Sequence, residues 1–425
     1  MTTFHVLTAG CSTNQSDAEQ MAGLLKQAKF ELVEKIEDAD VVVFNTCAVK
    51  TPSENPLFTQ LDQFKKDHPY KIAVISGCIA PADKQRLKDY SLIGTKQIHH
   101  IVQVVEEALH DNVLQLLNHD EMPPLNLPKV RKNPLVEILP INRGCLDAYA
   151  AFGKGKKAQG KIISYPAAAI VEAATKAVKE GVKEIWLTSR DAFGYGSEIG
   201  TDLPALLKQV VQIPGDFKIR IDMGNPGHLS KISAKLVEIY KHPKIFKFLH
   251  LPLQAGHDET LKAMRRSYTV EEYLQAIYLF KREIPEMNII TDIMVGYPTE
   301  TDDHYWGTLE VVRKTTPDSI NISRFGPRPD MPATQLPGLP EEVVQHRCKV
   351  LTDIFHNASK IQNERWLDWK GEILIDEKGR ESGQWMGRNN SYKQIIVEGD
   401  FKLGDMLQVQ IVKAETFDLR GKVVS

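Results

Sequence analysis

The chain has 425 residues, 42% of them hydrophobic and 25% charged, which is enough for two or three globular domains. Its 53 Lys and Arg residues nearly balance its 55 Asp and Glu residues, so net charge gives no global attraction to nucleic acid, DNA included, and any RNA contact must be a local patch. It has neither a basic, apolar leader nor an apolar run of membrane-spanning length, so we expect a cytoplasmic protein without a membrane partner.

Residues 1–120 alternate strand and helix patterns, which predicts a small α/β domain. The clearest elements are a helix and three strands, expected at Ser16–Phe30, Phe4–Thr8, Val41–Phe44 and Ile72–Ser76. Each strand leads into a turn that carries a cysteine: Cys11, Cys47 and Cys78. If the strands are parallel, their C-terminal ends meet at one sheet edge, where open α/β sheets bind ligands. A single free cysteine is commonly a small core residue, but three at matching positions favour a shared metal site.

Residues 121–134 are rich in proline and carry a basic cluster, which is typical of an extended linker. Residues 135–362 then alternate strands and helices, which predicts a partial (β/α)6 barrel with functional loops at the strand C-termini. The six strands are expected at Val136–Ile141, Glu184–Thr188, Lys218–Ile221, Phe246–Leu251, Met287–Met294 and Ser319–Arg324. The five helices are expected at Pro166–Glu180, Leu203–Val211, Ser230–Tyr240, Val270–Ile284 and Asp302–Thr316.

Residues 363–425 change to short β-rich runs separated by turns, which predicts a small antiparallel β-barrel. The runs are Gly371–Ile375, Gln394–Val397, Met406–Val412 and Arg420–Val424. Basic and aromatic side chains among them could form an RNA-binding face: Arg380, Trp385, Arg388, Tyr392 and Lys393. A solvated barrel surface is the alternative for any one of them. The predicted fold is therefore α/β: an N-terminal α/β domain, a partial barrel and a C-terminal β-barrel.

Motifs lie around these elements in a recognisable order. They are Gly10–Asp17, Asn45–Glu54, Gly77–Ala80, His250–Gly256, Leu261–Thr269, Thr291–Thr301 and Asn321–Pro329. Together they resemble the methylthiotransferases of the radical-AdoMet superfamily, most closely the archaeal and eukaryotic branch that methylthiolates threonylcarbamoyladenosine at tRNA position 37. The resemblance spans essentially the whole chain.

This resemblance implies ligands and a partner. It assigns Cys11, Cys47 and Cys78 to an auxiliary 4Fe–4S cluster that supplies sulfur, and Cys145 to a second cluster that chelates AdoMet. It places six further residues at the AdoMet site: Asp191, Asn225, His250, Gln254, Arg266 and Arg324. It also implies that the C-terminal barrel is a TRAM module, and that the partner is the tRNA anticodon stem-loop.

The loop that begins at Cys145 departs from the family pattern. In the family the Gly-Cys pair is followed by cysteines four and seven residues later, whereas Tyr149 and Phe152 stand at those places here. One thiolate is too few for a cluster, and a neutral phenol is a poor iron ligand. Further departures are an extra residue before Gly160 and changed residues at Gln159, Arg190 and Gly224. The sequence therefore predicts that the AdoMet-binding cluster and reductive AdoMet cleavage are lost.

Three hypotheses follow for the function. The first is a divergent paralogue that binds tRNA and one auxiliary cluster without radical chemistry. The second is an active methylthiotransferase with an atypical cluster site, and the third is a non-radical sulfur carrier that uses the N-terminal cysteines. The first predicts one cluster per chain and the second predicts two. Cys348, in the expected helix Glu341–His356, is interpreted as a packing residue.

Overall fold

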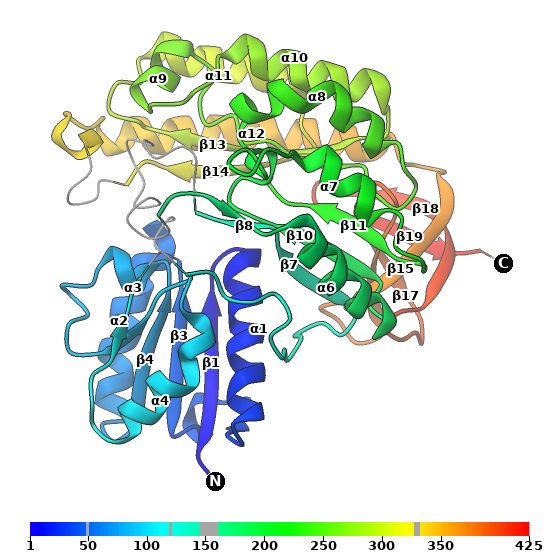
Figure 1. Cartoon of the computed structure of the whole chain (residues 1–425). Helices are drawn as coiled ribbons and strands as arrows, with labels where there is room; N and C mark the ends of the chain where they lie inside the picture. Colours follow the sequence, from blue (N-terminus) through cyan, green and yellow to red (C-terminus); the bar gives the residue numbers. More distant parts are fainter. Residues whose placement is uncertain (48–50, 119–120, 145–159, 327–331, 425) are drawn as a thin grey trace. The chain divides into compact units, whose positions relative to one another are not determined.

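The computed structural model (Figure 1) describes residues 1–47, 51–118, 121–144, 160–326 and 332–424, with only the backbone at 51–56. Its contacts define two compact units. The first comprises Met1–Pro134, Ile138–Ala173 and Thr188–Arg190, and the second comprises Leu135–Glu137, Ala174–Leu187 and Asp191–Ser425. The finer division at residues 120, 134 and 362 stays a prediction. Among the described residues, no helix combines the length and the apolar character that a membrane crossing requires.

The first unit is built on a six-stranded sheet of order β2-β1-β3-β4-β5-β6, in which every neighbouring pair is parallel. The strands are β1 (Thr3–Ala9), β2 (Glu31–Leu32), β3 (Val41–Thr46), β4 (Ile72–Gly77), β5 (Ser91–Ile93) and β6 (Gln115–Leu116). The helices are α1 (Ser12–Gln27), α2 (Thr51–Asp67), α3 (Ile79–Ala82) and α4 (Ile101–Leu109), with 3-10 turns η1 (Ile36–Asp38) and η2 (Ile98–His100). The expected strands and helix are confirmed, although α1 begins at Ser12 rather than Ser16.

The central strand β3 explains why this sheet is covered on both faces. All six of its residues are buried, and successive side chains of a strand point to opposite faces. Val42 and Phe44 join one apolar cluster with residues of α2 and α3, while Val41 and Val43 join another with residues of α1 and α4. Its continuous apolar sequence is what a parallel strand between two helical layers needs, and Figure 1 shows these layers on the two sides of the sheet.

Two three-stranded sheets follow, of order β11-β10-β7 and β12-β13-β14. Their strands are β7 (Val136–Pro140), β10 (Glu184–Thr188), β11 (Lys218–Ile221), β12 (Phe248–His250), β13 (Asn288–Val295) and β14 (Ser319–Arg324). The helices are α6 (Ala167–Lys179), α7 (Leu203–Val210), α8 (Pro226–Tyr240), α9 (Asp258–Ala263), α10 (Val270–Glu283), α11 (Asp302–Thr315) and α12 (Glu341–Glu364). All expected strands and helices of the partial barrel are present.

Two local differences from the predicted elements have clear physical causes. Helix α8 begins at Pro226, four residues before the expected Ser230, because the Asn225 side chain accepts the Gly227 N–H and proline suits the first helical turn. An unexpected antiparallel pair, β8 (Asn142–Arg143) with β9 (Ile163–Ser164), brackets the cysteine loop. It escaped prediction because two-residue strands carry no periodic pattern.

The C-terminal segment forms a closed barrel of order β15-β16-β17-β19-β18. Its strands are β15 (Lys370–Lys378), β16 (Gln384–Arg388), β17 (Gln394–Glu398), β18 (Met406–Ala414) and β19 (Leu419–Val423). The barrel is confirmed, with two corrections: β16 was missed because its five residues do not alternate between apolar and polar side chains, and β17 pairs with β19 in parallel. The interior is aliphatic: Ile373, Ile375, Ile395, Val397, Val409, Ile411 and Leu419.

Candidate functional site

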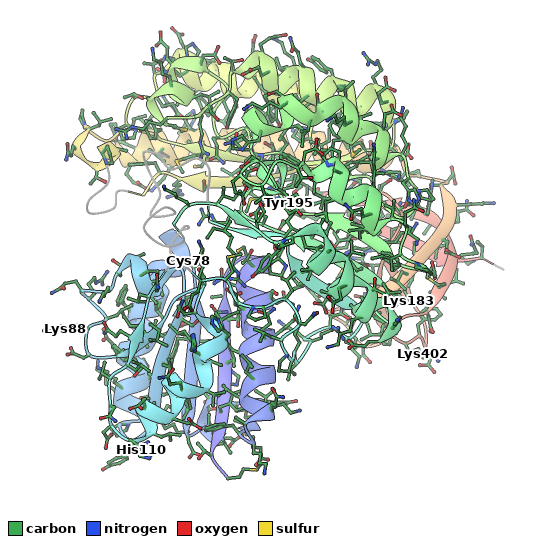
Figure 2. All side chains as sticks on the ribbon, in the orientation of Figure 1. Cys78, Lys88, His110, Lys183, Tyr195 and Lys402 are labelled. Atoms are coloured by element: carbon green, nitrogen blue, oxygen red, sulfur yellow. The ribbon has the colours of Figure 1, made fainter. Side chains whose placement is uncertain are left out.

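Three cysteines meet at the C-terminal edge of the first sheet. The parallel register pairs Thr46 of β3 with Gly77 of β4. Cys47 and Cys78 are the residues that come directly after this pair, so they start from matching positions. Ala9 of β1 pairs with Thr46, and Cys11 lies two residues beyond it as the N-cap of α1. Figure 2 shows Cys78 at this end of the sheet and His110 at the opposite end. The three cysteines, which we call the thiol triad, are thus brought together by register.

The thiols of the triad interact with one another. Cys47 hydrogen-bonds to Cys78, and Cys11 lies close enough to act on Cys78 electrostatically. The hydrogen bond with Cys47, and then burial, raise the pKa of the Cys78 thiol well above its ordinary value, while the cation of Arg190 acts in the opposite direction. Crowded thiols resist ionising together unless a cation takes the place of their protons. The triad is therefore a set of soft ligands suited to a metal.

A buried amide network supports the triad. The Asn14 carbonyl oxygen accepts from the Cys11 thiol at 3.4 Å, and the Asn14 amide donates to Asn45 Oδ1 at 3.2 Å. The Asn45 amide in turn donates to the backbone oxygen of Asn14 at 2.6 Å. Gly77, next to Cys78, has φ +86°, and a Cβ there would lie 2.3 Å from the Thr46 backbone oxygen. Only glycine fits this turn, which holds Cys78 beside Cys47.

The donor set of the triad fits an iron–sulfur cluster. Such clusters are held by cysteine thiolates, and the triad supplies three from three strand ends, two of them buried. When bound, a cluster supplies iron and inorganic sulfide, while the chain supplies thiolates and the amide network that positions them. Zinc also accepts thiolates, so the geometry alone defines a thiolate metal site rather than its metal.

The second predicted metal loop lies largely outside the described residues. Cys145, Tyr149, Phe152 and Gln159 all fall in residues 145–159, so the predictions made on them stay predictions. What the structure describes is the base of this loop, the β8–β9 pair. Gly144 there has φ +95°, and a Cβ would lie 2.0 Å from the Lys161 backbone oxygen. The loop therefore begins at a turn that requires glycine.

Arg143 anchors this base, and the sequence reasoning missed it. Its Nη2 donates to Asp17 Oδ1 of α1 at 2.6 Å and its Nη1 donates to Asp17 Oδ2 at 3.2 Å. Nη1 also donates to the Thr95 backbone oxygen at 2.7 Å, and Nε donates to the Tyr165 hydroxyl at 3.3 Å. Burial raises the pKa of Asp17, and Arg143 acts in the opposite direction. The partners are 126 positions apart in the sequence, so no local pattern indicated this pair.

Two of the predicted AdoMet-site residues, Asp191 and Asn225, are hydrogen-bonded to each other. Asp191 Oδ1 accepts the backbone N–H groups of Asn225 at 2.9 Å and Gly194 at 3.3 Å. Asp191 Oδ2 contacts His228 Nδ1 at 2.5 Å, and His228 was not predicted. A histidine held in this way by a carboxylate has a fixed ring orientation. The group lies just beyond β10 and β11, where barrel folds place functional loops.

His250, Gln254 and Arg324 lie at the corresponding ends of β12–β14. His250 Nε2 is 3.2 Å from Asp292 Oδ1, and the Gln254 backbone N–H donates to the Asp292 backbone oxygen at 2.8 Å. Arg324 Nη1 donates to Glu341 Oε1 at 2.9 Å near the surface. Arg266 lies past the end of α9, where its N–H donates to the Leu261 backbone oxygen. Their placement agrees with a barrel site, and the AdoMet assignment stays a prediction.

The predicted RNA-binding residues do not form one exposed face. Arg380 is exposed and Trp385 is partly buried. Arg388 pairs with Asp376 at 3.0 Å and keeps 15% of its side chain exposed. The Tyr392 ring packs 4.8 Å from the Phe246 ring. These two side chains are held within the second unit, so their predicted RNA role is not supported.

Lys393 is a further correction. Its Nζ lies 2.7 Å from Asp318 Oδ1, with only 8% of the lysine side chain exposed. It also donates to Asn363 Oδ1 at 2.9 Å. The partners lie on α12 and just before β14, so this lysine holds the barrel against the rest of the second unit instead of facing solvent.

Three family models match the chain in succession. The uncharacterized protein family UPF0004 covers residues 3–94, the Radical SAM superfamily covers 147–312, and the TRAM domain covers 371–424. The chain is 36% identical over 431 residues to a threonylcarbamoyladenosine tRNA methylthiotransferase of Xenopus laevis, covering 99% of this chain and 76% of that protein. It is 34% identical over 430 residues to a probable protein of the same name from Pyrococcus horikoshii, covering 100% of both.

Solved structures give the fold alone, because their sequence identity is low. The cobalamin-dependent S-adenosylmethionine radical enzyme OxsB superposes with a TM-score of 0.51 at 12% identity, covering 83% of this chain and 56% of that one. The radical S-adenosylmethionine methyltransferase TsrM from Kitasatospora setae has a TM-score of 0.51 at 12% identity, covering 76% and 72%.

Proposed function

Because the chain belongs to the family of threonylcarbamoyladenosine tRNA methylthiotransferases, we propose that it binds tRNA and holds one 4Fe–4S cluster without cleaving AdoMet. The cluster is assigned to the thiol triad of residues 1–120, and tRNA binding to the barrel of residues 363–425. The observation that carries the proposal is the convergence of Cys11, Cys47 and Cys78 at one sheet edge.

Ligand count supports the loss of radical chemistry. The triad offers three thiols, whereas the loop after Gly144 has one, Cys145, with Tyr149 and Phe152 where the family has cysteines. Iron of a 4Fe–4S cluster is held by several thiolates, and neither a neutral phenol nor a phenyl ring replaces them. Arg190, one of the changed residues, acts electrostatically on Cys78 of the triad. Its guanidinium offsets part of the negative charge that three thiolates and a cluster bring.

The tRNA part of the proposal rests on the match of residues 371–424 to the TRAM domain and on the names of the relatives. With Arg388, Tyr392 and Lys393 held inside the second unit, Arg380 and Trp385 are the retained candidates for contacts with RNA. The proposed ligand is the anticodon stem-loop. Because net charge is near zero, binding is expected to depend on a few local phosphate pairs and to weaken as salt rises.

The test is anaerobic purification and reconstitution, with iron and sulfide counted per chain. We expect about four of each, since one 4Fe–4S cluster is bound, and no 5′-deoxyadenosine after AdoMet and a strong reductant are added. Cys47→Ser should abolish most of the iron, whereas Cys145→Ser and the control Cys348→Ser should leave the count unchanged. A count of about eight with 5′-deoxyadenosine formed would overturn the proposal.

The second candidate is an active methylthiotransferase. The match of residues 147–312 to the Radical SAM superfamily favours it, as does the presence of Asp191, His250 and Arg324 at strand ends of the barrel. An active methylthiotransferase differs from the first candidate in one measurable respect: Cys145→Ser should remove about half of its iron. Counting iron per chain in this variant therefore decides between the two candidates.

A further inference from the structure

A cluster of metal-ligand side chains lies in the first unit and includes none of the triad cysteines. His99 and His100 end the 3-10 turn η2, directly before α4. Glu121 comes from the segment that follows β6. One ligand atom from each of the three residues lies within 4.8 Å of the other two. A single ion could therefore contact all three side chains.

The spacing of the ligand atoms fits a coordinated ion. The Nε2 atoms of His99 and His100 each lie 3.6 Å from the same atom, Glu121 Oε2. This separation is longer than a strong N–H···O hydrogen bond of about 2.7–3.2 Å. Ligands placed tetrahedrally around Zn²⁺ at about 2.0–2.2 Å stand about 3.3–3.6 Å apart. The separations therefore match two edges of a zinc coordination tetrahedron.

Neighbouring groups position these side chains. The Gln97 amide donates to Glu121 Oε2 at 3.2 Å, the same oxygen that faces both imidazoles. The guanidinium of Arg143 is paired with Asp17.

His99 shows an additional feature of an incomplete site. Its Nδ1 is buried and has no hydrogen-bond partner among the described residues, while its Nε2 has only the long contact with Glu121. Burying a polar nitrogen without a partner is costly. An ion at Nε2 would give this ring a strong interaction that the side chains around it do not provide.

A second histidine cluster, in the second unit, provides an internal comparison. His257, Glu259 and His304 also lie within ligand range of one another. However, His304 Nε2 is 3.2 Å from Glu259 Oε2, a hydrogen-bond length, and His257 Nδ1 accepts the Glu259 N–H. The two rings are stacked, with 17° between their planes. The rings of His99 and His100 are tilted by 41°.

We propose that His99, His100 and Glu121 bind one Zn²⁺ ion. Two imidazoles and a carboxylate leave a fourth position for water, which is the ligand pattern of open zinc sites, and the mixed nitrogen and oxygen set does not suit Mg²⁺ or Ca²⁺. The ion joins the start of the 121–134 segment to η2. The site includes no residue of the thiol triad, so it stands or falls separately from the proposed cluster.

The experiment uses the full-length, untagged protein and Zn²⁺ in competition with a chromophoric chelator. We expect His100→Ala and Glu121→Gln each to weaken this zinc site at least 100-fold, because loss of even an outer-shell partner costs about 10–100-fold. The matched control is His110→Ala, an exposed histidine at the other end of α4 (Figure 2). His110→Ala should bind as many zinc ions as the unaltered chain. Each of the two site variants should bind one zinc ion fewer.

Cobalt separates this site from the thiol triad, which also binds soft metals. Co²⁺ on the thiols gives thiolate charge-transfer absorption in the near ultraviolet, whereas Co²⁺ on imidazole and carboxylate gives only weak visible bands. The visible bands without thiolate character should disappear in His100→Ala, and the charge-transfer bands should persist. Because Glu121 is exposed, Glu121→Gln keeps the test valid if His100→Ala folds poorly. Equal zinc affinity and stoichiometry in Glu121→Gln and the unaltered chain would overturn the proposal.

Discussion

Replacing Asp17 with Asn tests whether the base of the cysteine loop depends on α1. The Asp17 and Arg143 side chains are 1% and 2% exposed, and two hydrogen bonds, of 2.6 and 3.2 Å, join them. Asp17→Asn leaves the buried guanidinium of Arg143 without its counter-charge. Breaking one partner of a buried ion pair costs about 3–5 kcal/mol, which corresponds to a fall in Tm of roughly 3–6 °C for a chain of 425 residues.

The measurement is thermal unfolding by circular dichroism at pH 7, with an exposed pair as the control. The carboxylate of Glu238 lies 2.8 Å from Lys241 at the surface. Glu238→Gln should leave Tm nearly unchanged, because exposed ion pairs contribute little. The double replacement Asp17→Leu with Arg143→Met should cost less than Asp17→Asn alone, because it leaves no unpaired charge. A Tm change for Asp17→Asn as small as that of Glu238→Gln would refute the reasoning.

Three further predictions concern single positions. Gly77→Ala should lower both Tm and iron content, because its Cβ would meet the Thr46 backbone oxygen at 2.3 Å; full iron loading would contradict this. Burial raises the pKa of Asp376 to about 7, so the folded chain retains a proton that the unfolded chain loses above about pH 4. The stability from this group is fully present below about pH 4 and is lost as the pH rises through 7. Asp376→Asn should therefore flatten the Tm profile between about pH 4 and 7, and parallel profiles would argue against it. Arg380→Ala should reduce the salt dependence of tRNA binding by about one unit of slope, measured beside the control Lys88→Ala; an unchanged slope would place the RNA contact elsewhere.

The sequence predicted the framework well because burial leaves a periodic signal. The apolar run of β3 and its turn at Cys47 follow from a strand buried on both faces, and the apolar run Ile72–Ser76 located β4 in the same way. The matched register of β1, β3 and β4 then places the thiols at one edge. Where an element lacks that signal, as in β16, whose residues do not alternate, or in the two-residue strands β8 and β9, the pattern gave no indication.

Side-chain roles were harder to predict than elements. A lysine or arginine in a sequence is normally assigned to the surface, because charged residues are seldom buried. Lys393 and Arg388 are exceptions whose partners, Asp318 and Asp376, do not neighbour them in sequence. The same holds for Arg143, whose partner Asp17 is 126 residues away. Long-range pairing of this kind becomes visible only once the strands are in register.

The position of α1 bears on why a changed cysteine loop is compatible with an intact fold. The helix starts directly after Cys11 of the thiol triad, and its Asp17, on the second turn, holds Arg143 two residues before Cys145. Among the described residues, Arg143, Asp17 and Gly144 anchor the base of the loop. Cys145→Ser changes none of these three residues. Its iron count, read together with its Tm, therefore separates the loss of a cluster ligand from a loss of the fold.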